Sequence, residues 1–347
     1  GRGAAKAAEP VQADLTARTG TVAPLIEMRA VSIAVGQDRP MELVRNAHLE
    51  VMPGETVALV GESGSGKTLT SLSLMGLLSD VLHVTEGQML YSTADGAIYD
   101  LAQMDEHAMR KLRGSEISMV FQDAAAALNP VHRIGEQIEE ALRAKGMREG
   151  AGRKARVAEL LRQVGIPDPE RRHRAYPHEL SGGQRQRAMI ALAVANAPRL
   201  LIADEPTTAL DPTIQAQILD LFRQLKRDNP ELGLIFVTHD LAVVSELADR
   251  VVVMYAGEVV ESGPVAEIFA RPVHPYTAAL IASVPEGGAD RLRTIPGTVP
   301  PPNDLPPGCR FAPRCDHALA ACRAAPPQAE IPAPGRETRC IRWKEVC

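Results

Sequence analysis

The sequence predicts an α/β fold built on a mostly parallel sheet. Between residues 182 and 254, apolar segments of strand length alternate with helical segments, and such alternation is typical of βα units. Near residue 61, a glycine-rich loop joins an apolar strand to a helix. All five cysteines follow a proline-rich stretch near the end of the chain. The composition therefore predicts a main α/β domain followed by a small C-terminal module.

The predicted elements follow one another in a regular order. Residues 25–35 and 47–52 are expected to form strands, and the apolar run at 55–61 forms a buried strand that leads into a helix at 67–78. Residues 80–116 favour short antiparallel strands, and 117–121 a further strand. Apolar residues at a spacing of three to four then predict helices from 131 to about 163. The rest of the domain alternates between helices at 182–196, 213–228 and 241–248 and strands at 200–203, 233–237 and 250–254.

These elements suggest three parts along the chain. Residues 1–24 are polar and rich in alanine, and are expected to be a disordered leader. Residues 25–284 form the main domain, with a helical subdomain at about 131–181. Residues 285–347 form a proline-rich connector, which cannot be helical, and the cysteine-containing module.

Charge and hydropathy limit the classes of partner. The formal net charge is -5 and 45% of the residues are hydrophobic, so nothing favours a nucleic-acid partner. No stretch approaches the roughly 20 apolar residues that span a bilayer. We therefore expect a cytoplasmic chain that reaches a membrane only through other subunits.

The glycine-rich loop has the pattern of a phosphate-binding loop. Its glycines allow backbone N–H groups to surround phosphate oxygens at a helix N-terminus. Lys67 would contact the β- and γ-phosphates of ATP, and the hydroxyl of Thr68 would ligate Mg²⁺. The predicted nucleotide-binding residues of this loop are Gly61, Glu62, Ser63, Gly64, Ser65, Gly66, Lys67 and Thr68.

Two carboxylates follow the apolar strand at residues 200–203. Asp204, at the tip of the strand, is suited to hold Mg²⁺ through water. Glu205, one residue further, can orient and polarise the water that attacks the γ-phosphate. An apolar strand that ends in acids is common by itself, but together with Lys67 it indicates ATP hydrolysis.

A second helix N-terminus suited to binding phosphate indicates the protein family more specifically. Residues Ser181, Gly182, Gly183 and Gln184 follow Leu180 and open a helix. This is the signature sequence of the ATPases of ABC transporters, which the chain resembles from about residue 25 to its end. The resemblance implies an ABC-type nucleotide-binding domain, with a RecA-like parallel sheet core, an antiparallel β subdomain and a helical subdomain.

The resemblance also assigns roles to three further residues. Gln122 corresponds to the glutamine that contacts Mg²⁺ and the attacking water and couples to membrane subunits. Asp211 corresponds to a loop that crosses the dimer interface, and His239 to the histidine at the γ-phosphate. The family implies a head-to-tail dimer, in which the signature sequence of one chain closes on ATP bound by the other.

Several segments resemble the ATPases of oligopeptide and dipeptide importers, and lean toward the first of the two ATPases in such systems. They include Phe121-Gln122-Asp123, His274-Pro275-Tyr276-Thr277 and residues 204–211. This branch implies a heterodimer with a second, similar ATPase, two transmembrane permease subunits and an extracytoplasmic peptide-binding protein. The chain would then lie peripherally on the cytoplasmic face of the bacterial inner membrane.

Two other functions remain open from the sequence. A nickel or metal-chelate importer of the same family would carry a similar ATPase, because the cargo never touches this subunit. A soluble ABC ATPase acting on DNA or ribosomes would need long coiled-coil insertions or two nucleotide sites in one chain, and this sequence has neither.

One family feature is missing at the expected adenine site. The family usually stacks an aromatic ring from an early strand on the base, but no Phe, Tyr or Trp precedes Tyr91. Val35 occupies the position where the ring is expected. Aliphatic contact with the base, or weaker binding of adenine, would follow.

The cysteines of the tail lack the paired spacing of a zinc ribbon. The tail resembles the C-terminal module of peptide-importer ATPases, where four such cysteines bind a [4Fe–4S] cluster, for which thiolates are the standard ligands. Zinc, reduced thiols or disulfides are the alternatives. Cys347 lies outside the pattern, and the four predicted ligands are Cys309, Cys315, Cys322 and Cys340.

Overall fold

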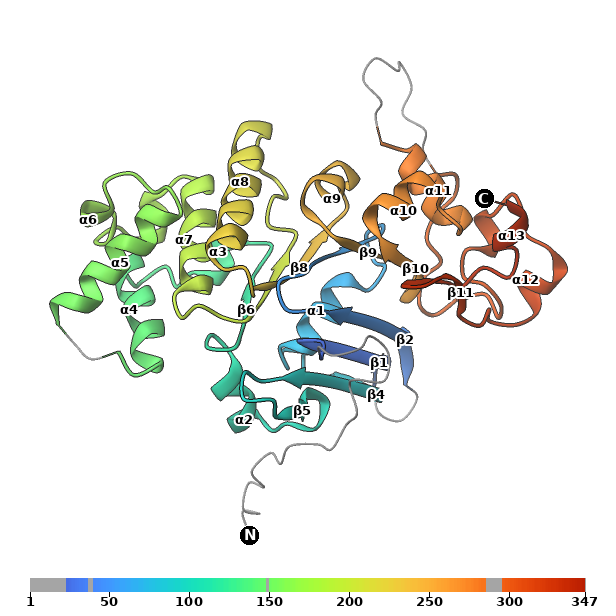
Figure 1. The fold of residues 1–347 in the computed structure, drawn as a ribbon, viewed down its shortest axis with the longest axis horizontal. Helices are drawn as coiled ribbons and strands as arrows, with labels where there is room; N and C mark the ends of the chain where they lie inside the picture. The colour runs from blue at the N-terminus through green and yellow to red at the C-terminus, as the bar shows by residue number, and fades with distance from the viewer. Residues whose placement is uncertain (1–22, 37–39, 148–149, 285–294, 347) are drawn as a thin grey trace, which may run out of the picture. The chain divides into compact units, whose positions relative to one another are not determined.

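The computed structural model describes residues 23–36, 40–147, 150–284 and 295–346. These residues form two compact units, which we name the continuous unit (residues 105–235) and the two-segment unit (residues 23–104 and 236–346) (Figure 1). The leader expected at 1–24 lies outside the described residues as far as residue 22, and so do residues 285–294 of the expected connector.

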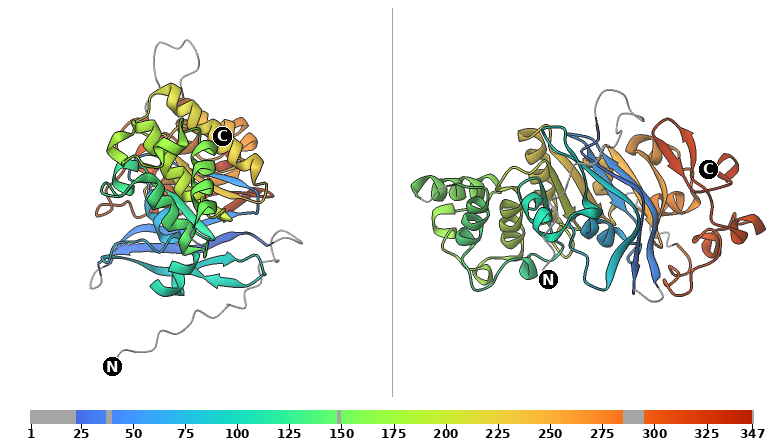
Figure 2. Two further views of the ribbon diagram at one scale, coloured as in Figure 1. Left: turned by 90° about the vertical axis from the view of Figure 1, so that its left-hand side faces the viewer. Right: turned by 90° about the horizontal axis from the view of Figure 1, so that it is seen from below.

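The two-segment unit contains an antiparallel sheet with the strand order β2-β1-β4-β5 (Figure 2). The central strand β1 pairs through Ile26 with Val51 of β2 and with Tyr91 of β4. The strand expected at 47–52 begins earlier, at Met41. Residues 41–46 are mostly half buried, so their apolar and polar side chains do not alternate clearly enough to predict a strand. The strands are β1 (Ile26–Val35), β2 (Met41–Val51), β4 (Leu82–Ser92) and β5 (Ile98–Asp100).

The part of a second, larger sheet that belongs to this unit has the order β11-β12-β10-β9-β3. Strand β3 is buried along its whole length, which explains its near-continuous run of apolar residues, and it pairs in parallel with β9. Glu261 of β10 pairs with Thr338 of β12, so the chain's last segment adds strands to this sheet. The strands are β3 (Thr56–Val60), β9 (Arg250–Tyr255), β10 (Glu258–Pro264), β11 (Glu330–Ala333) and β12 (Arg336–Thr338).

Three aromatic rings connect the C-terminal segment to this sheet. Tyr255 lies 4.6 Å from Tyr276 and 5.2 Å from Phe311 between ring centroids, and all three side chains are buried. Such ring pairs stabilise a core beyond the area that they bury. The helices of this unit are α1 (Lys67–Leu74), α9 (Leu241–Leu247), α10 (Val265–Ala270), α11 (Pro275–Ala282), α12 (Ala320–Ala324) and α13 (Trp343–Val346).

The continuous unit combines a parallel strand pair with helices. Ile117 of β6 pairs with Leu200 of β7, and β8 (Gly233–Thr238) contains the boundary between the two units. The predicted order of strands and helices from 117 to 235 is found. The elements are β6 (Ile117–Val120), β7 (Leu200–Asp204), α2 (Glu106–Leu112), α3 (Ala124–Ala127), α4 (Ile134–Ala144), α5 (Ala151–Gln163), α6 (Pro169–Arg172), α7 (Gly182–Val194) and α8 (Pro212–Asp228).

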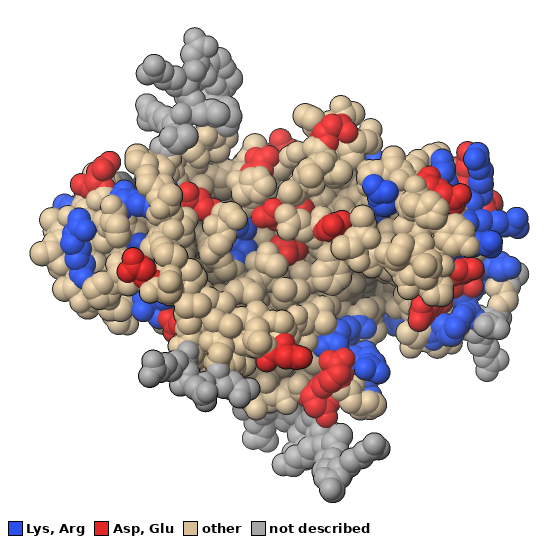
Figure 3. Space-filling view, turned by 180° about the vertical axis from the view of Figure 1, so that it is seen from behind, with Lys and Arg blue, Asp and Glu red and all other residues tan. Residues whose placement is uncertain are grey.

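Charges of both signs lie close together on the surface. Figure 3 shows Lys and Arg side chains interspersed with Asp and Glu on one face of the molecule. Around α6, Arg162 contacts Glu170 at 3.2 Å, and His173 contacts Glu139 at 2.9 Å. These acidic neighbours reduce the net field of the basic residues at 171–174. Among the helices in the described part of the chain, none combines the length and the apolar character that crossing a bilayer requires.

Candidate functional site

The glycine-rich loop lies where the sequence predicts it, between β3 and α1. Gly61 has a φ of 151°, and a Cβ atom there would clash with the carbonyl oxygen of Met254. Gly66 is the N-cap of α1 with a φ of 99°. Glycine is required at both positions, because L side chains rarely adopt these backbone angles. The loop therefore brings its backbone close to the start of the helix.

Lys67 begins α1, and its side chain folds back over the loop. Its Nζ donates hydrogen bonds to the carbonyl oxygens of Gly61 at 2.9 Å and Glu62 at 3.1 Å, and the residue is 5% exposed. Thr68, the next residue, is exposed, as are Ser63 and Gly64. The loop thus presents its outer residues to solvent while Lys67 lies beneath it.

Glu205 follows β7 in a constrained conformation. Its φ is 45°, a backbone region that non-glycine residues rarely occupy and that is found at functional sites. Its carboxylate accepts hydrogen bonds from the Thr208 hydroxyl at 2.8 Å and from the side-chain amide of Gln122 at 3.3 Å. Asp204, at the end of the strand, is 3% exposed. The structure therefore brings Gln122 and Glu205 together, although 83 positions separate them.

The signature residues form the first turn of α7. Ser181 is the N-cap: its hydroxyl accepts from the backbone N–H of Gln184 at 3.3 Å, and the Gln184 side chain accepts from the Ser181 N–H at 3.2 Å. A Cβ atom on Gly183 would lie 2.9 Å from the Ile214 side chain. A Cβ atom on Gly182 would have no described atom within 4 Å, apart from its neighbours in the chain and the backbone of its own helix. Gly183 thus permits helix packing, and Gly182 leaves an open approach to the helix start.

The two remaining predicted residues lie at helix starts. Asp211 is the N-cap of α8, and its carboxylate accepts from the N–H of Ile214 at 3.0 Å. This capping contact is a structural role that the motif did not reveal. His239 is exposed between β8 and Asp240, the N-cap of α9. Asp211 belongs to the continuous unit with the signature residues, Gln122, Asp204 and Glu205, whereas His239 belongs to the two-segment unit with the glycine-rich loop.

The expected adenine position has an aliphatic residue. Val35 ends β1 and is partly exposed. Tyr91, the first aromatic residue of the chain, is fully buried in β4. Its ring is therefore not placed to replace the missing aromatic contact.

The four predicted cysteine ligands line one mostly apolar pocket, together with Phe311 and Ile341. Cys309 lies a few residues before a 3-10 turn (Ala312–Arg314) and Cys315 directly after it, whereas Cys322 lies in α12 and Cys340 after β12. None of the four forms a disulfide. Burial raises the pKa of the Cys309 thiol to about 11, and burial also raises that of Cys315.

Among the described residues, no three His, Cys, Asp or Glu side chains are placed so that they could hold a metal ion, and this includes the four cysteines of the pocket. The backbone N–H of Leu319 donates to the Cys322 sulfur at 3.5 Å.

Two family models match the chain. Residues 44–208 match the ABC transporter family. Residues 260–322 match the C-terminal region of oligopeptide/dipeptide transporters, and this segment contains three of the four pocket cysteines.

Curated relatives match nearly the full chain. A protein of Brucella ovis, provisionally named a peptide import ATP-binding protein, is 50% identical over 93% of this chain and 98% of its own length. A protein of Brucella abortus with the same kind of name is 52% identical over 89% of this chain and 94% of its own length.

Solved structures show the same fold. The dimeric structure of MJ0796, a bacterial ABC transporter cassette, matches with a TM-score of 0.60 and 29% identity over 69% of this chain and 98% of that chain. The same cassette in a post-hydrolysis state bound to ADP and Pi matches with a TM-score of 0.60 and 28% identity, over the same shares of the two chains. The predicted ABC-type fold is confirmed, and the chain belongs to the ATPases of ABC transporters, in the branch that carries the oligopeptide/dipeptide transporter C-terminal region.

Proposed function

We propose that this chain binds and hydrolyses MgATP to power an importer of di- and oligopeptides. The observation that carries the proposal is the match of almost the whole chain, the cysteine-containing tail included, to proteins named for peptide import. This match favours peptides over nickel chelates as cargo. It also favours a transport ATPase over a soluble ABC ATPase that acts on DNA or ribosomes.

The glycine-rich loop would bind the phosphates of ATP. Its backbone N–H groups and the start of α1 supply partial positive charge. Lys67 would exchange its contacts with the loop carbonyls for the β- and γ-phosphates. Thr68, Gln122 and Asp204 would hold Mg²⁺, which neutralises phosphate charge when bound.

Glu205 would act as the general base for hydrolysis. Its carboxylate is oriented by two side-chain donors and by a constrained backbone. It would take a proton from the water that attacks the γ-phosphate, and His239 would contact that phosphate.

Thr208 is a positioning residue for this base, which motif matching alone did not single out. Thr208→Val removes a hydrogen bond to the Glu205 carboxylate worth about 1 kcal/mol, so we expect kcat to fall roughly fivefold. The KM for ATP stays within about twofold, because the contact does not bear on phosphate binding. Phosphate release at varied ATP concentration measures both. Thr208→Ser keeps the hydroxyl and should restore the rate; equal loss in both variants would contradict this role.

A second ATPase would complete each nucleotide site. The open approach at Gly182 and the helix start at Ser181 support contact with ATP bound to the partner. Gly183, Gln184 and Asp211 would lie at the same interface. The proposed partner is a similar, non-identical ATPase, and both would dock on two permease subunits that receive peptide from an extracytoplasmic binding protein. The chain would thus lie on the cytoplasmic face of the inner membrane.

The cysteine pocket would hold a [4Fe–4S] cluster. Cys309, Cys315, Cys322 and Cys340 would bind its four irons, and the cluster would fix a segment that has few apolar residues of its own. The buried thiols must lose their protons to bind it.

The cluster proposal predicts the effect of removing a single ligand. After anaerobic purification, we expect roughly four irons per chain and a broad visible absorption band. Cys315→Ser should lose most of the iron and the absorption band, and should unfold at a lower temperature. Cys347→Ser should keep the iron content, the band and the unfolding temperature of the wild type. A colourless wild-type protein with one zinc, or without metal, would contradict the proposal.

Growth of cells tests the transport function. A strain that lacks this chain and requires an amino acid supplied only within a short peptide should grow when the wild-type chain is restored, but not with Glu205→Gln. If growth on the peptide does not depend on the chain, while uptake of a nickel chelate does, metal import replaces peptide import as the function.

A further inference from the structure

Glu62 of the glycine-rich loop is bound by two residues that lie outside the loop. The backbone N–H of Glu62 donates to the Tyr276 hydroxyl at 2.9 Å. Its carboxylate accepts two hydrogen bonds from the guanidinium of Arg314, at 2.7 and 3.1 Å. The backbone N–H and the carboxylate of Glu62 are thus bound to residues far along the chain. Charge-assisted, two-pronged contacts of this type are strong and geometrically specific.

Arg314 is itself held in one place. Its side chain is only 4% exposed. It donates to the carbonyl oxygens of Pro296 at 2.8 Å and Ile295 at 3.1 Å, and to the Tyr255 hydroxyl at 3.2 Å. Its guanidinium lies 5.6 Å from the centroid of the Tyr255 ring. A side chain with so many partners can impose its position on Glu62.

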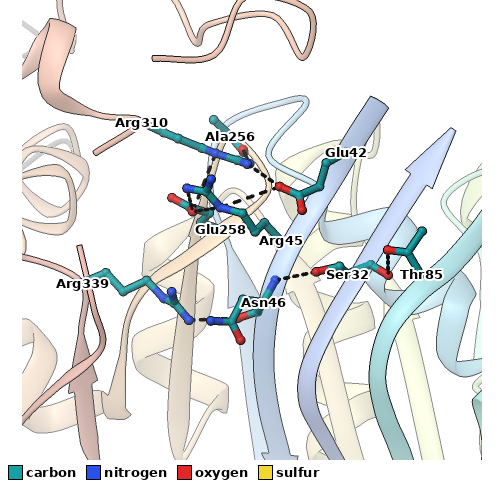
Figure 4. A network of polar contacts seen from close by, with 9 residues as sticks. All are labelled: Ser32, Glu42, Arg45, Asn46, Thr85, Ala256, Glu258, Arg310 and Arg339. Atoms are coloured by element: carbon teal, nitrogen blue, oxygen red, sulfur yellow. Dashed lines mark hydrogen bonds and ion pairs between the residues drawn. The ribbon is translucent and has the colours of Figure 1, made fainter. Parts of the chain in front are cut away.

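A second arginine of the same segment contacts the residue next to Gly257, which itself contacts the loop. Arg310 is buried, with its side chain 2% exposed, and donates to the carbonyl oxygen of Ala256 and to Glu42 at 2.9 Å (Figure 4). The neighbouring N–H of Gly257 donates to the carbonyl oxygen of Ser65 in the loop, at 2.9 Å. Figure 4 shows Arg310 and Arg45 converging on Glu258.

These contacts give the cysteine-containing tail a direct connection to the nucleotide loop. Arg310 follows Cys309 and Arg314 precedes Cys315 in the sequence. We propose that Arg314 is a positioning residue for ATP binding: through Glu62 it keeps the glycine-rich loop in its phosphate-binding shape. The inference rests on the proposed role of this loop and deepens it, because affinity for ATP then depends on the C-terminal segment.

A double-mutant cycle on the full chain tests this inference. Without this contact, the loop is less ordered in the ATP-free protein. Ordering the loop when ATP binds then costs free energy, and this cost raises the Kd. We expect Arg314→Gln and Glu62→Gln each to raise the Kd for MgATP roughly tenfold, and the double variant to be no weaker than either single one. Arg314→Lys keeps the charge but not the two-pronged geometry, and should fall between. In the assembled transporter, KM for ATP should rise while kcat changes less than about twofold.

Controls separate positioning from folding. Arg323→Gln changes an exposed arginine of α12 in the same tail and should leave the Kd unchanged. If Arg314→Gln does not fold, Glu62→Gln tests the same contact from a side chain that is 31% exposed. A lower melting temperature for Arg314→Gln with wild-type affinity for ATP would overturn the inference, and so would fully additive losses in the cycle.

A different result is expected if the glycine-rich loop is not the nucleotide site. If it is the site, Lys67→Ala should weaken the binding of ATP whether or not Arg314 positions the loop. If Lys67→Ala binds ATP as tightly as the wild type, the loop is not the nucleotide site, and the inference about Arg314 falls with it. If Lys67→Ala weakens binding but the Arg314 and Glu62 variants do not, only the positioning role is lost.

Discussion

Glu205→Gln is expected to lower kcat for ATP hydrolysis by a factor of roughly a hundred to ten thousand, the range typical of a general base. The amide is isosteric and can still accept from the Thr208 hydroxyl, so local structure should be kept. It cannot accept a proton from water. The Kd for ATP should therefore stay within about twofold. Phosphate release at saturating MgATP and equilibrium binding of ATP measure the two effects separately.

A matched carboxylate provides the control. Glu231→Gln changes an exposed glutamate between α8 and β8 in the same unit, and should leave the rate unchanged. If Glu205→Gln keeps more than about a tenth of the wild-type rate, a loss well below that of a general base, another group takes the proton.

Lys67→Ala is expected to raise the Kd for ATP by roughly a hundredfold. An ammonium that donates to charged phosphate oxygens contributes about 3 kcal/mol, which corresponds to this factor. Lys67 is buried beneath the loop, so its removal also leaves the carbonyls of Gly61 and Glu62 without this donor. Titration with a fluorescent ATP analogue measures the change.

Folding must be checked in parallel, because the residue is buried. The circular dichroism spectrum at working temperature should remain that of the wild type. Lys111→Ala removes an exposed lysine of α2 and should bind ATP normally. Unchanged affinity in folded Lys67→Ala would contradict the assignment of the loop.

Local patterns predicted much of the fold, including the elements on which the candidate site residues lie. The strand before the glycine-rich loop was expected at 55–61 and is found at Thr56–Val60, because a buried strand between turn residues has few alternatives. Helix α7 begins at Gly182 as predicted, since Ser181 and Gln184 cap it within the sequence itself. Signals of this kind require only neighbouring residues.

Contacts between distant residues could not be predicted in the same way. The hydrogen bond from Gln122 to Glu205 depends on how β6 and β7 pair. The contact between Arg314 and Glu62 joins residues 252 positions apart. The start of β2 at Met41 was missed because a half-buried edge carries a weak apolar pattern. Pairing partners are set by tertiary packing, which a single sequence does not display.

Uptake of a labelled peptide into vesicles tests the central claim most directly. Vesicles would contain the two permease subunits, the partner ATPase and this chain, with the peptide-binding protein and peptide outside and MgATP inside. The account predicts uptake that requires ATP and the wild-type chain, and that Glu205→Gln reduces to background although its ATP binding is intact. Uptake that continues at the wild-type rate with Glu205→Gln, or without this chain, would contradict it.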